Sequence, residues 1–431
     1  MMGYMSYGFV LLIAAGLLVK KIVPSGWSRW VLLAMSLVFL AAAGGYQSFL
    51  FWGISTAAGY AAALLIEKYP SGCPDGTLSR NGDYPAGQER DKAGTLRKRR
   101  LVLILAVAFQ LGLLAYFKYA NLPFYTLEAI GEITGRVFEY EPKERLALFG
   151  ISFYTLMVIG YDADVYRGEI RAVRHFPVFS LFTGYFGHLA QGPVDSYKET
   201  GESLAWPASP SFEDMQDGCL EILTGLFKKL ILSERLALMA DTVYGDYASY
   251  GGWYLMLAAA AFSLQLYTDF SGCMDLVSGV SRLFGVKIAE NFRQPFFSES
   301  ISEFWRRWHI TLGAFLRKNV YIPLGGNRKG VFRKYVNVMA VFFLSGLWHG
   351  GKWTFIIGTG ILQGAYMIGE EIVRPQALSG CRAAGVDPGA SVLRWLRRLR
   401  TFVLVSAGFV LFRSDSLSMA GQVLIGMVQK S

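Results

Sequence analysis

Residues 101–117 read LVLILAVAFQLGLLAYF, a stretch in which Gln110 is the only amide or charged side chain. About 20 apolar residues in a helix cross the hydrocarbon core of a bilayer. Similar runs occupy residues 7–19, 30–45 and 353–369, and 53% of the chain is hydrophobic while 17% is charged. A soluble domain carries about 25% charged residues. The sequence therefore predicts an all-α polytopic membrane protein with about ten to twelve transmembrane or re-entrant helices.

Basic residues lie between the apolar runs, so the net charge of +10 indicates membrane topology and not nucleic-acid binding. Four segments concentrate this charge: 20–29, 67–100, 306–334 and 374–400. Short loops rich in Lys and Arg stay in the cytosol, which predicts that all four face that side. The acidic segment 119–146 and the N-terminus then lie outside, as in a multi-pass protein of the cell membrane.

We predict one membrane domain over residues 1–431. The first apolar run lacks the basic start and the A-x-A site of a cleaved signal peptide, so it is interpreted as a retained span. Gly, Pro and polar residues fill positions 70–95, which predicts a mobile cytosolic loop within 67–100. No repeat of fixed period is visible, and this disfavours a transporter built from two related halves.

Residues 300–334 are the most informative stretch. Ser300 and Glu303 form an S-x-x-E capping box, which predicts a helix start. At 100° per residue, one apolar arc collects Ile301, Phe304, Trp305, Trp308, Leu312, Phe315 and Leu316. We therefore predict one amphipathic helix in the membrane interface, with Arg306 and Arg307 turned towards water or an anionic ligand and His309 at the edge of the arc.

The helix should end at PLGGNRKG, where Pro323 and the pair Gly325 and Gly326 favour a turn. Glu303 is the only carboxylate among many basic side chains between 300 and 334. Such a cytosolic field attracts anionic lipid, an acyl-coenzyme or an acidic carrier protein.

A second informative stretch, FLSGLWHGGKW, covers residues 343–353. If 335–349 rise from the cytosol as a helix, they climb roughly 22 Å into a core of about 30 Å, which places His349 deep in the membrane. Residues 353–373 return, so HGGK is predicted to be the bend of a helical hairpin. Glycines four apart, at 346 and 350 and at 360 and 364, allow close helix packing. Irregular backbone at this depth lines a wet cavity or is buried in protein, and we predict that His349 lies beside a cavity.

An ionisable side chain at membrane depth is a candidate functional residue. Imidazole can accept a proton from a hydroxyl near neutral pH. The alternatives are that His349 only hydrogen-bonds a neighbouring helix and that His309 only reaches the interface. His175 and His188 have no partners at motif spacing and are predicted to be structural.

The sequence contains no H-E-x-x-H, G-x-S-x-G or G-x-x-x-x-G-K-[ST] motif. Cysteines 73, 219, 273 and 381 are scattered, so neither a zinc site nor a disulfide framework is indicated. The chemistry that fits is direct acyl transfer from a thioester to a hydroxyl, with no bound cofactor or metal.

The stretch SISEFWRRWHITLGAFLRKNVYIPLGGNR, followed by GLWHG, resembles the membrane-bound O-acyltransferase (MBOAT) family, in its bacterial branch of alginate O-acetyltransferase membrane subunits. The resemblance extends from about residue 110 to 415. Further matching segments, in the same order, are GISFYT (150–155), DVYRG (164–168), GLFKKLILSERLA (225–237), LQLYTDFSGCMDL (264–276) and LFGVKIAENFRQPF (283–296).

This resemblance implies membrane helices around a central funnel or tunnel, with a catalytic core at 300–373. It implies that His349 is the family's histidine and that His309 is the second, more variable one. Asp269 and Asn291 match family motifs and are expected in the cavity lining, with a buried hydrogen-bonding role as the alternative. The substrate-binding residues expected are Trp348, Trp305, Arg306, Arg307, Asp269 and Asn291.

The implied donor is acetyl-coenzyme A or an acyl carrier thioester, and the acceptor is an envelope polysaccharide. An extracytoplasmic acyltransferase partner and an acyl carrier protein are the implied protein partners. Against this resemblance we expect two departures, a longer loop at 67–100 and a last helix that is missing or shortened. D-alanyl transfer to teichoic acid, a glycan or lipid exporter, and a scaffold without chemistry remain alternatives.

Overall fold

The computed structural model describes residues 2–69, 86–138 and 146–429, so Cys73 and most of the predicted loop at 67–100 lie outside the described residues. Every regular element in these ranges is a helix, as predicted. The chain divides into two compact units. The first comprises Met1–Phe117, Leu146–Cys219 and Ser278–Ala289, and the second Lys118–Arg145, Leu220–Val277 and Glu290–Ser431.

Long apolar helices dominate the first unit. Its elements are α1 (Tyr7–Ile22), α2 (Ser28–Lys68), α3 (Ala86–Lys118), α5 (Ile151–Arg167), α6 (Phe176–Gly184), α7 (Phe186–Leu189) and α8 (Tyr197–Ala205). Helix α2 bends at Gly45, whose φ of 70° suits a residue without a side chain. It packs on α5 where Gly59 would place a Cβ 2.3 Å from Val158. Glycine is therefore what allows these two helices to approach.

Within the described residues, two helical stretches are long and apolar enough to cross a membrane, Ser25–Lys68 and Gly94–Lys118. The predicted number of ten to twelve crossings stays a prediction. His188 lies fully buried in the first unit, where its Nε2 is 3.3 Å from the Asp195 carboxylate and its Nδ1 3.3 Å from the Phe182 carbonyl oxygen. These contacts agree with the structural role predicted for this histidine.

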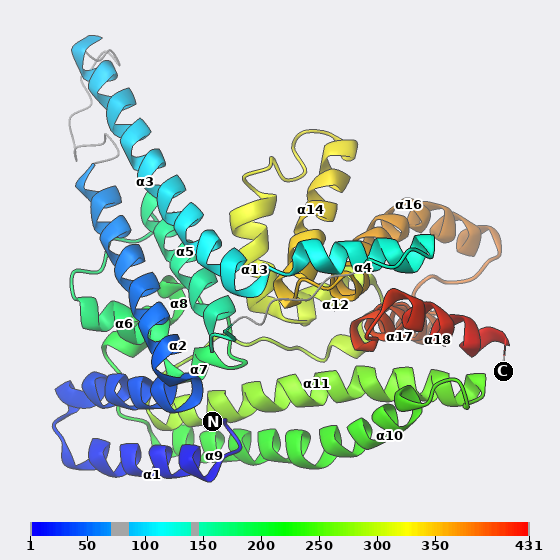
Figure 1. Cartoon of the computed structure of the whole chain (residues 1–431), viewed down its shortest axis with the longest axis horizontal. Helices are drawn as coiled ribbons and strands as arrows, with labels where there is room; N and C mark the ends of the chain where they lie inside the picture. Colours follow the sequence, from blue (N-terminus) through cyan, green and yellow to red (C-terminus); the bar gives the residue numbers. More distant parts are fainter. Residues whose placement is uncertain (1, 70–85, 139–145, 430–431) are drawn as a thin grey trace. The chain divides into compact units, whose positions relative to one another are not determined.

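The second unit contains α4 (Leu122–Thr134), η2 (Phe227–Ser233), α10 (Glu234–Gly245), most of α11 (Gly252–Leu283) and the end of α9 (Phe212–Leu226). Helices α10 and α11 run side by side (Figure 1), and their apolar faces share one core with α12 and α17. Its later elements are α12 (Ile301–Arg307), α13 (Ile310–Leu316), η4 (Arg317–Tyr321), α14 (Val331–His349), α15 (Trp353–Phe355), η5 (Ile356–Ile361), α16 (Leu362–Ala383), α17 (Ser391–Arg413) and α18 (Leu417–Gln429).

The predicted turn at PLGGNRKG is confirmed, because η4 ends at Tyr321 and α14 begins at Val331. Gly325, Gly326 and Gly330 all have positive φ between these helices. A side chain other than glycine is disfavoured in that region of backbone conformation. The glycines therefore allow the chain to reverse before α14.

Candidate active site

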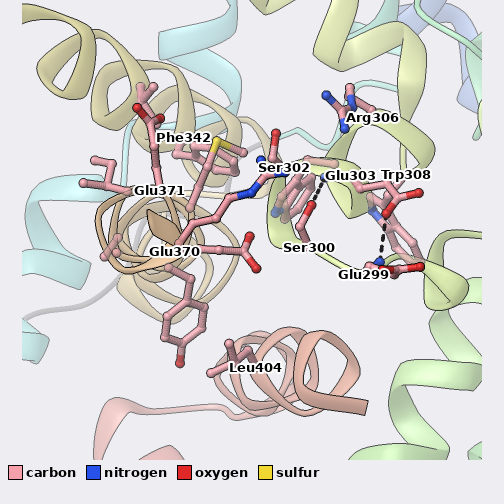
Figure 2. A pocket seen from close by; sticks show the side chains of 18 of the residues that line it. Glu299, Ser300, Ser302, Glu303, Arg306, Trp308, Phe342, Glu370, Glu371 and Leu404 are labelled. Carbon is pink, nitrogen blue, oxygen red and sulfur yellow. Dashed lines mark hydrogen bonds between the residues drawn. The ribbon is translucent and has the colours of Figure 1, made fainter. Parts of the chain in front are cut away.

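A cavity of about 1620 Å³ lies in the second unit, with walls from α12, α13, α14, α16 and α17. Both predicted site histidines, His309 and His349, line it, together with Trp305 and Arg306. Figure 2 shows part of the wall, with Glu370 on α16 and Leu404 on α17. The prediction that His349 lies beside a cavity is confirmed.

The predicted start of the helix at Ser300 is also confirmed. The Ser300 hydroxyl accepts a hydrogen bond from the Glu303 amide at 3.1 Å, and the Glu303 carboxylate accepts one from the Glu299 amide at 2.8 Å (Figure 2). A side-chain oxygen at this position satisfies an amide that the first turn leaves without a helical partner. The cap fixes the direction in which α12 enters the cavity wall.

The prediction of one helix from Ser300 to Leu316 is wrong. Helix α12 ends at Arg307, Trp308 is extended and α13 begins only at Ile310. An antiparallel bridge pairs Trp308 with Phe292, and the Ile310 amide donates to the Asn291 carbonyl at 3.1 Å. This pairing with an earlier segment replaces helical hydrogen bonds, so tertiary contacts override the helical periodicity.

Asn291 holds the start of α13 in place. Its Oδ1 accepts hydrogen bonds from the Thr311 amide at 3.1 Å and from the Thr311 hydroxyl at 2.8 Å, and the side chain is buried. Asn291 is not among the residues that line the cavity. Its predicted contact with substrate stays a prediction, while the structure gives it an anchoring role next to His309.

His309 occupies the break between α12 and α13 in the left-handed region, with φ 48° and ψ 53°. For a residue with a Cβ this conformation costs roughly 1–2 kcal/mol. The residue is 3% exposed, and its ring packs between Phe270 and Trp348, whose ring centroids are 5.0 Å and 5.4 Å away. Neither ring nitrogen has a hydrogen-bond partner within the described residues. A strained, buried polar side chain that lines a cavity is typical of a ligand-binding or catalytic group.

His349 is the last residue of α14, and the predicted helical hairpin is confirmed by α15, η5 and α16 after it. A Cβ at Gly346 would lie 2.9 Å from the Ile356 Cα, and a Cβ at Gly360 would lie 2.8 Å from the Phe342 carbonyl oxygen. The two arms therefore touch through backbone atoms, as small residues at this spacing allow. This contact fixes the end of α14 that carries His349.

Gly360→Ala is expected to destabilise the hairpin by about 1–3 kcal/mol, because the added methyl group meets backbone that cannot turn away. The midpoint of thermal unfolding in detergent measures this. Gly369→Ala on α16 is the matched control, since a Cβ there meets no atom within 4 Å. Equal stability of the two variants would contradict the proposed backbone contact.

The Trp348 ring lies beside both histidines, with its ring centroid 5.4 Å from that of His309 and 5.1 Å from that of His349. Phe412 covers His349 from α17, at 5.4 Å between centroids. Trp348 itself is not among the lining residues. It is therefore placed to orient the two imidazoles, and its predicted contact with substrate stays a prediction.

The other residues predicted to bind substrate differ in whether they line the cavity and in whether they are already paired. Trp305 lines the cavity and its indole N–H lies 3.4 Å from the Gln363 side-chain oxygen. Arg306 also lines it and forms no salt bridge with a described carboxylate, whereas Arg307 pairs with Glu303 at 2.5 Å. Asp269 pairs with Lys229 at 2.5 Å and does not line the cavity. Of the predicted charged residues, only Arg306 is both on the wall and available to an anion.

Carboxylates at the cavity wall bind the arginines of α17. Glu299 pairs with Arg397 and Arg394, and hydrogen bonds from these guanidinium groups, Arg397 first, lower the pKa of Glu299. Glu370 pairs with Arg400 and also accepts from the Ile301 amide at 2.9 Å. The sequence placed residues 374–400 on the cytosolic side but did not indicate that they help to build the cavity.

Lys118 was not predicted at all. It ends the apolar run of α3, and its ammonium donates a hydrogen bond to the Trp348 carbonyl oxygen. A lysine that follows an apolar run is also typical of a plain membrane boundary. No local pattern connects it with a residue so distant in the chain.

Within the described ranges, no group of three or more His, Cys, Asp and Glu side chains is suited to a metal ion.

Known proteins match the part of the chain that carries this cavity. Positions 169–378, which include both cavity histidines, match the membrane-bound O-acyltransferase family. A probable alginate O-acetylase of Azotobacter vinelandii is 38% identical over 330 residues, which cover 75% of this chain and 62% of the relative. A peptidoglycan O-acetyltransferase of Helicobacter pylori is 31% identical over 364 residues, 77% of this chain and 65% of the relative.

The chain belongs to the membrane-bound O-acyltransferase family. A more distant relative, a teichoic acid D-alanyltransferase of Bacillus subtilis, is 26% identical over 238 residues, 51% of this chain and 58% of that protein. The chain thus spans about 60% of the length of the alginate relatives it matches. The MBOAT match includes α12 to α15 and most of α16, the region that carries the two histidines.

Proposed function

We propose that this chain is a multi-pass membrane enzyme that transfers an acyl group, most simply acetyl, from a cytosolic thioester to a hydroxyl of an extracytoplasmic envelope polysaccharide. The observation that carries this proposal is that two histidines from separate elements meet in one cavity, with the ring of Trp348 beside both. The similarity to O-acetyltransferases of alginate and peptidoglycan supports the reaction class.

In this reaction His349 acts as the base. It removes the proton of the acceptor hydroxyl while the oxygen attacks the thioester carbonyl carbon. The carbon–sulfur bond then breaks, and the imidazolium returns the proton to the departing thiolate. General base catalysis of this kind contributes about 10²- to 10⁴-fold. His309, whose ring nitrogens have no partner within the described residues, holds the donor carbonyl or the acceptor.

The donor proposed is acetyl-coenzyme A or an acyl carrier protein, which reaches the cavity from the basic, cytosolic side. The cavity, of about 1620 Å³, is large enough for a thioester arm, and the carboxylates of Glu299 and Glu370 in its wall are paired with arginines. An extracytoplasmic acyltransferase is proposed to complete transfer to the polymer. Asp269 and Asn291 are proposed to support the site from outside the cavity.

Arg306→Ala is expected to raise the KM for the acyl donor by about 10- to 100-fold, because a charge-assisted hydrogen bond to a phosphate is worth about 1.5–3 kcal/mol. The rate at saturating donor should change less. Arg307→Ala is the matched control, since Arg307 already pairs with Glu303. Steady-state kinetics in proteoliposomes measure both variants, and an equal rise in KM would contradict the assignment of Arg306.

The experiment that tests the function is mass spectrometry of the envelope glycans of cells with and without the gene. We expect ester groups to disappear from one polymer on deletion and to return with the wild-type gene. Unchanged ester content would contradict the proposal. Labelled acetyl-coenzyme A and labelled D-alanyl carrier protein, offered to the purified enzyme, distinguish acetyl transfer from the D-alanyl transfer of the Bacillus subtilis relative.

A further inference from the structure

Lys118 contacts the end of the helix that carries His349. Its ammonium donates a hydrogen bond to the carbonyl oxygen of Trp348, the residue directly before His349. The same nitrogen lies 5.3 Å from the centre of the Trp348 ring. Lys118 thus makes two contacts with one residue, through its backbone and through its indole.

The hydrogen bond has a clear structural effect. The last four carbonyl groups of a helix have no helical partner and carry partial negative charge. The Gly350 amide donates to the Leu347 carbonyl at 3.1 Å, and Lys118 binds the carbonyl of Trp348. A cation at a helix C-terminus is favourable for the same electrostatic reason. Lys118 therefore fixes the backbone where α14 stops.

The indole contact extends this effect to both histidines. A cation above an indole face is attracted to it by about 0.5–2 kcal/mol. The Trp348 ring in turn contacts the rings of His309 and His349. An ammonium that holds the indole therefore orients both imidazoles together.

We propose that Lys118 is a positioning residue of the His349 site, which fixes Trp348 between the two histidines. This inference rests on the proposed acyl transfer. It assigns a role to a residue outside the cavity wall, on a helix that contributes no other group to the site.

The test compares Lys118→Gln with Lys118→Arg in proteoliposomes. Gln keeps a hydrogen-bond donor for the Trp348 carbonyl but has no charge, whereas Arg keeps both. We measure kcat and the KM for the donor in acyl transfer. Without the cation the indole is held less firmly beside the two imidazoles, so kcat of the Gln variant should fall by about 2- to 30-fold, the equivalent of a cation–indole attraction of about 0.5–2 kcal/mol. The Arg variant should keep the wild-type kcat, and the KM for the donor should not change in either.

An unchanged kcat in Lys118→Gln, or a fall in kcat together with a rise in the KM for the donor, would overturn the proposal. So would a Lys118→Arg variant that behaves like Lys118→Gln. If Lys118→Gln does not accumulate in the membrane, Lys118→Met provides the same uncharged comparison. A His349→Gln enzyme with wild-type activity would instead refute the proposed function, so the two failures are distinguishable.

Discussion

His349→Gln is expected to lower acyl transfer by about 10²- to 10⁴-fold, the contribution of a general base. Glutamine is polar and of similar length, so the end of α14 should keep its contacts with α15 and α17. Protein abundance and the thermal unfolding midpoint should therefore stay close to those of the wild type. Transfer of labelled acyl groups from the donor to the envelope glycan measures the effect.

His175→Gln is the matched control, because His175 is exposed at the start of α6, outside the second unit. It should leave transfer unchanged. The polymer should still reach the surface of cells that carry His349→Gln, without its ester groups. Loss of the polymer itself would favour an exporter, and full acylation would favour a scaffold without chemistry.

The hairpin around His349 was predictable because its signals are local. Gly346 and Gly350 lie within one turn of each other, and Gly360 and Gly364 repeat that spacing on the returning arm. One glycine of each pair, Gly346 and Gly360, meets backbone of the other arm, and this depends only on the size of the residue at those positions. The turn at Gly325 and Gly326 was predictable for the same reason, since it depends on backbone freedom at two adjacent residues.

The break at Trp308 and His309 was not predictable from its own stretch. The apolar periodicity there favours an unbroken helix, and the capping box at Ser300 supports the same conclusion. Pairing of Trp308 with Phe292 interrupts the helix, and this partner lies in a segment without any regular strand pattern. Apolar periodicity indicates which face of a helix is buried. It does not indicate whether another segment competes for the backbone hydrogen bonds of that helix.

Charge predicts the side of the membrane on which a segment lies, and this stays a prediction, but charge does not indicate distances within the fold. Arg306 and Arg307 are neighbours with the same chemistry, yet Arg306 lines the cavity while Arg307 binds Glu303. Lys118 and Trp348 lie 230 positions apart, so only the tertiary structure connects them. Asp269 matches a family motif, but its partly exposed carboxylate pairs with Lys229 and does not line the cavity.

His309→Gly is expected to relax the backbone while it removes activity. Glycine adopts the left-handed conformation at no steric cost, which offsets part of the packing lost with the ring. The thermal unfolding midpoint should therefore change little, whereas transfer should fall by at least about 10²-fold if the ring acts on substrate. The missing ring leaves a space between Phe270 and Trp348 that matches imidazole. Added imidazole should therefore restore part of the rate.

Gln294→Gly is the matched control for His309→Gly. Gln294 is the other residue besides glycine with positive φ in the described ranges, at 47°, and it does not line the cavity. The same relief of strain should raise its unfolding midpoint without loss of transfer. If Gln294→Gly lost as much activity as His309→Gly, the backbone conformation and not the imidazole would be the functional feature. If added imidazole restored nothing while the fold stayed intact, His309 would act only by packing against Trp348.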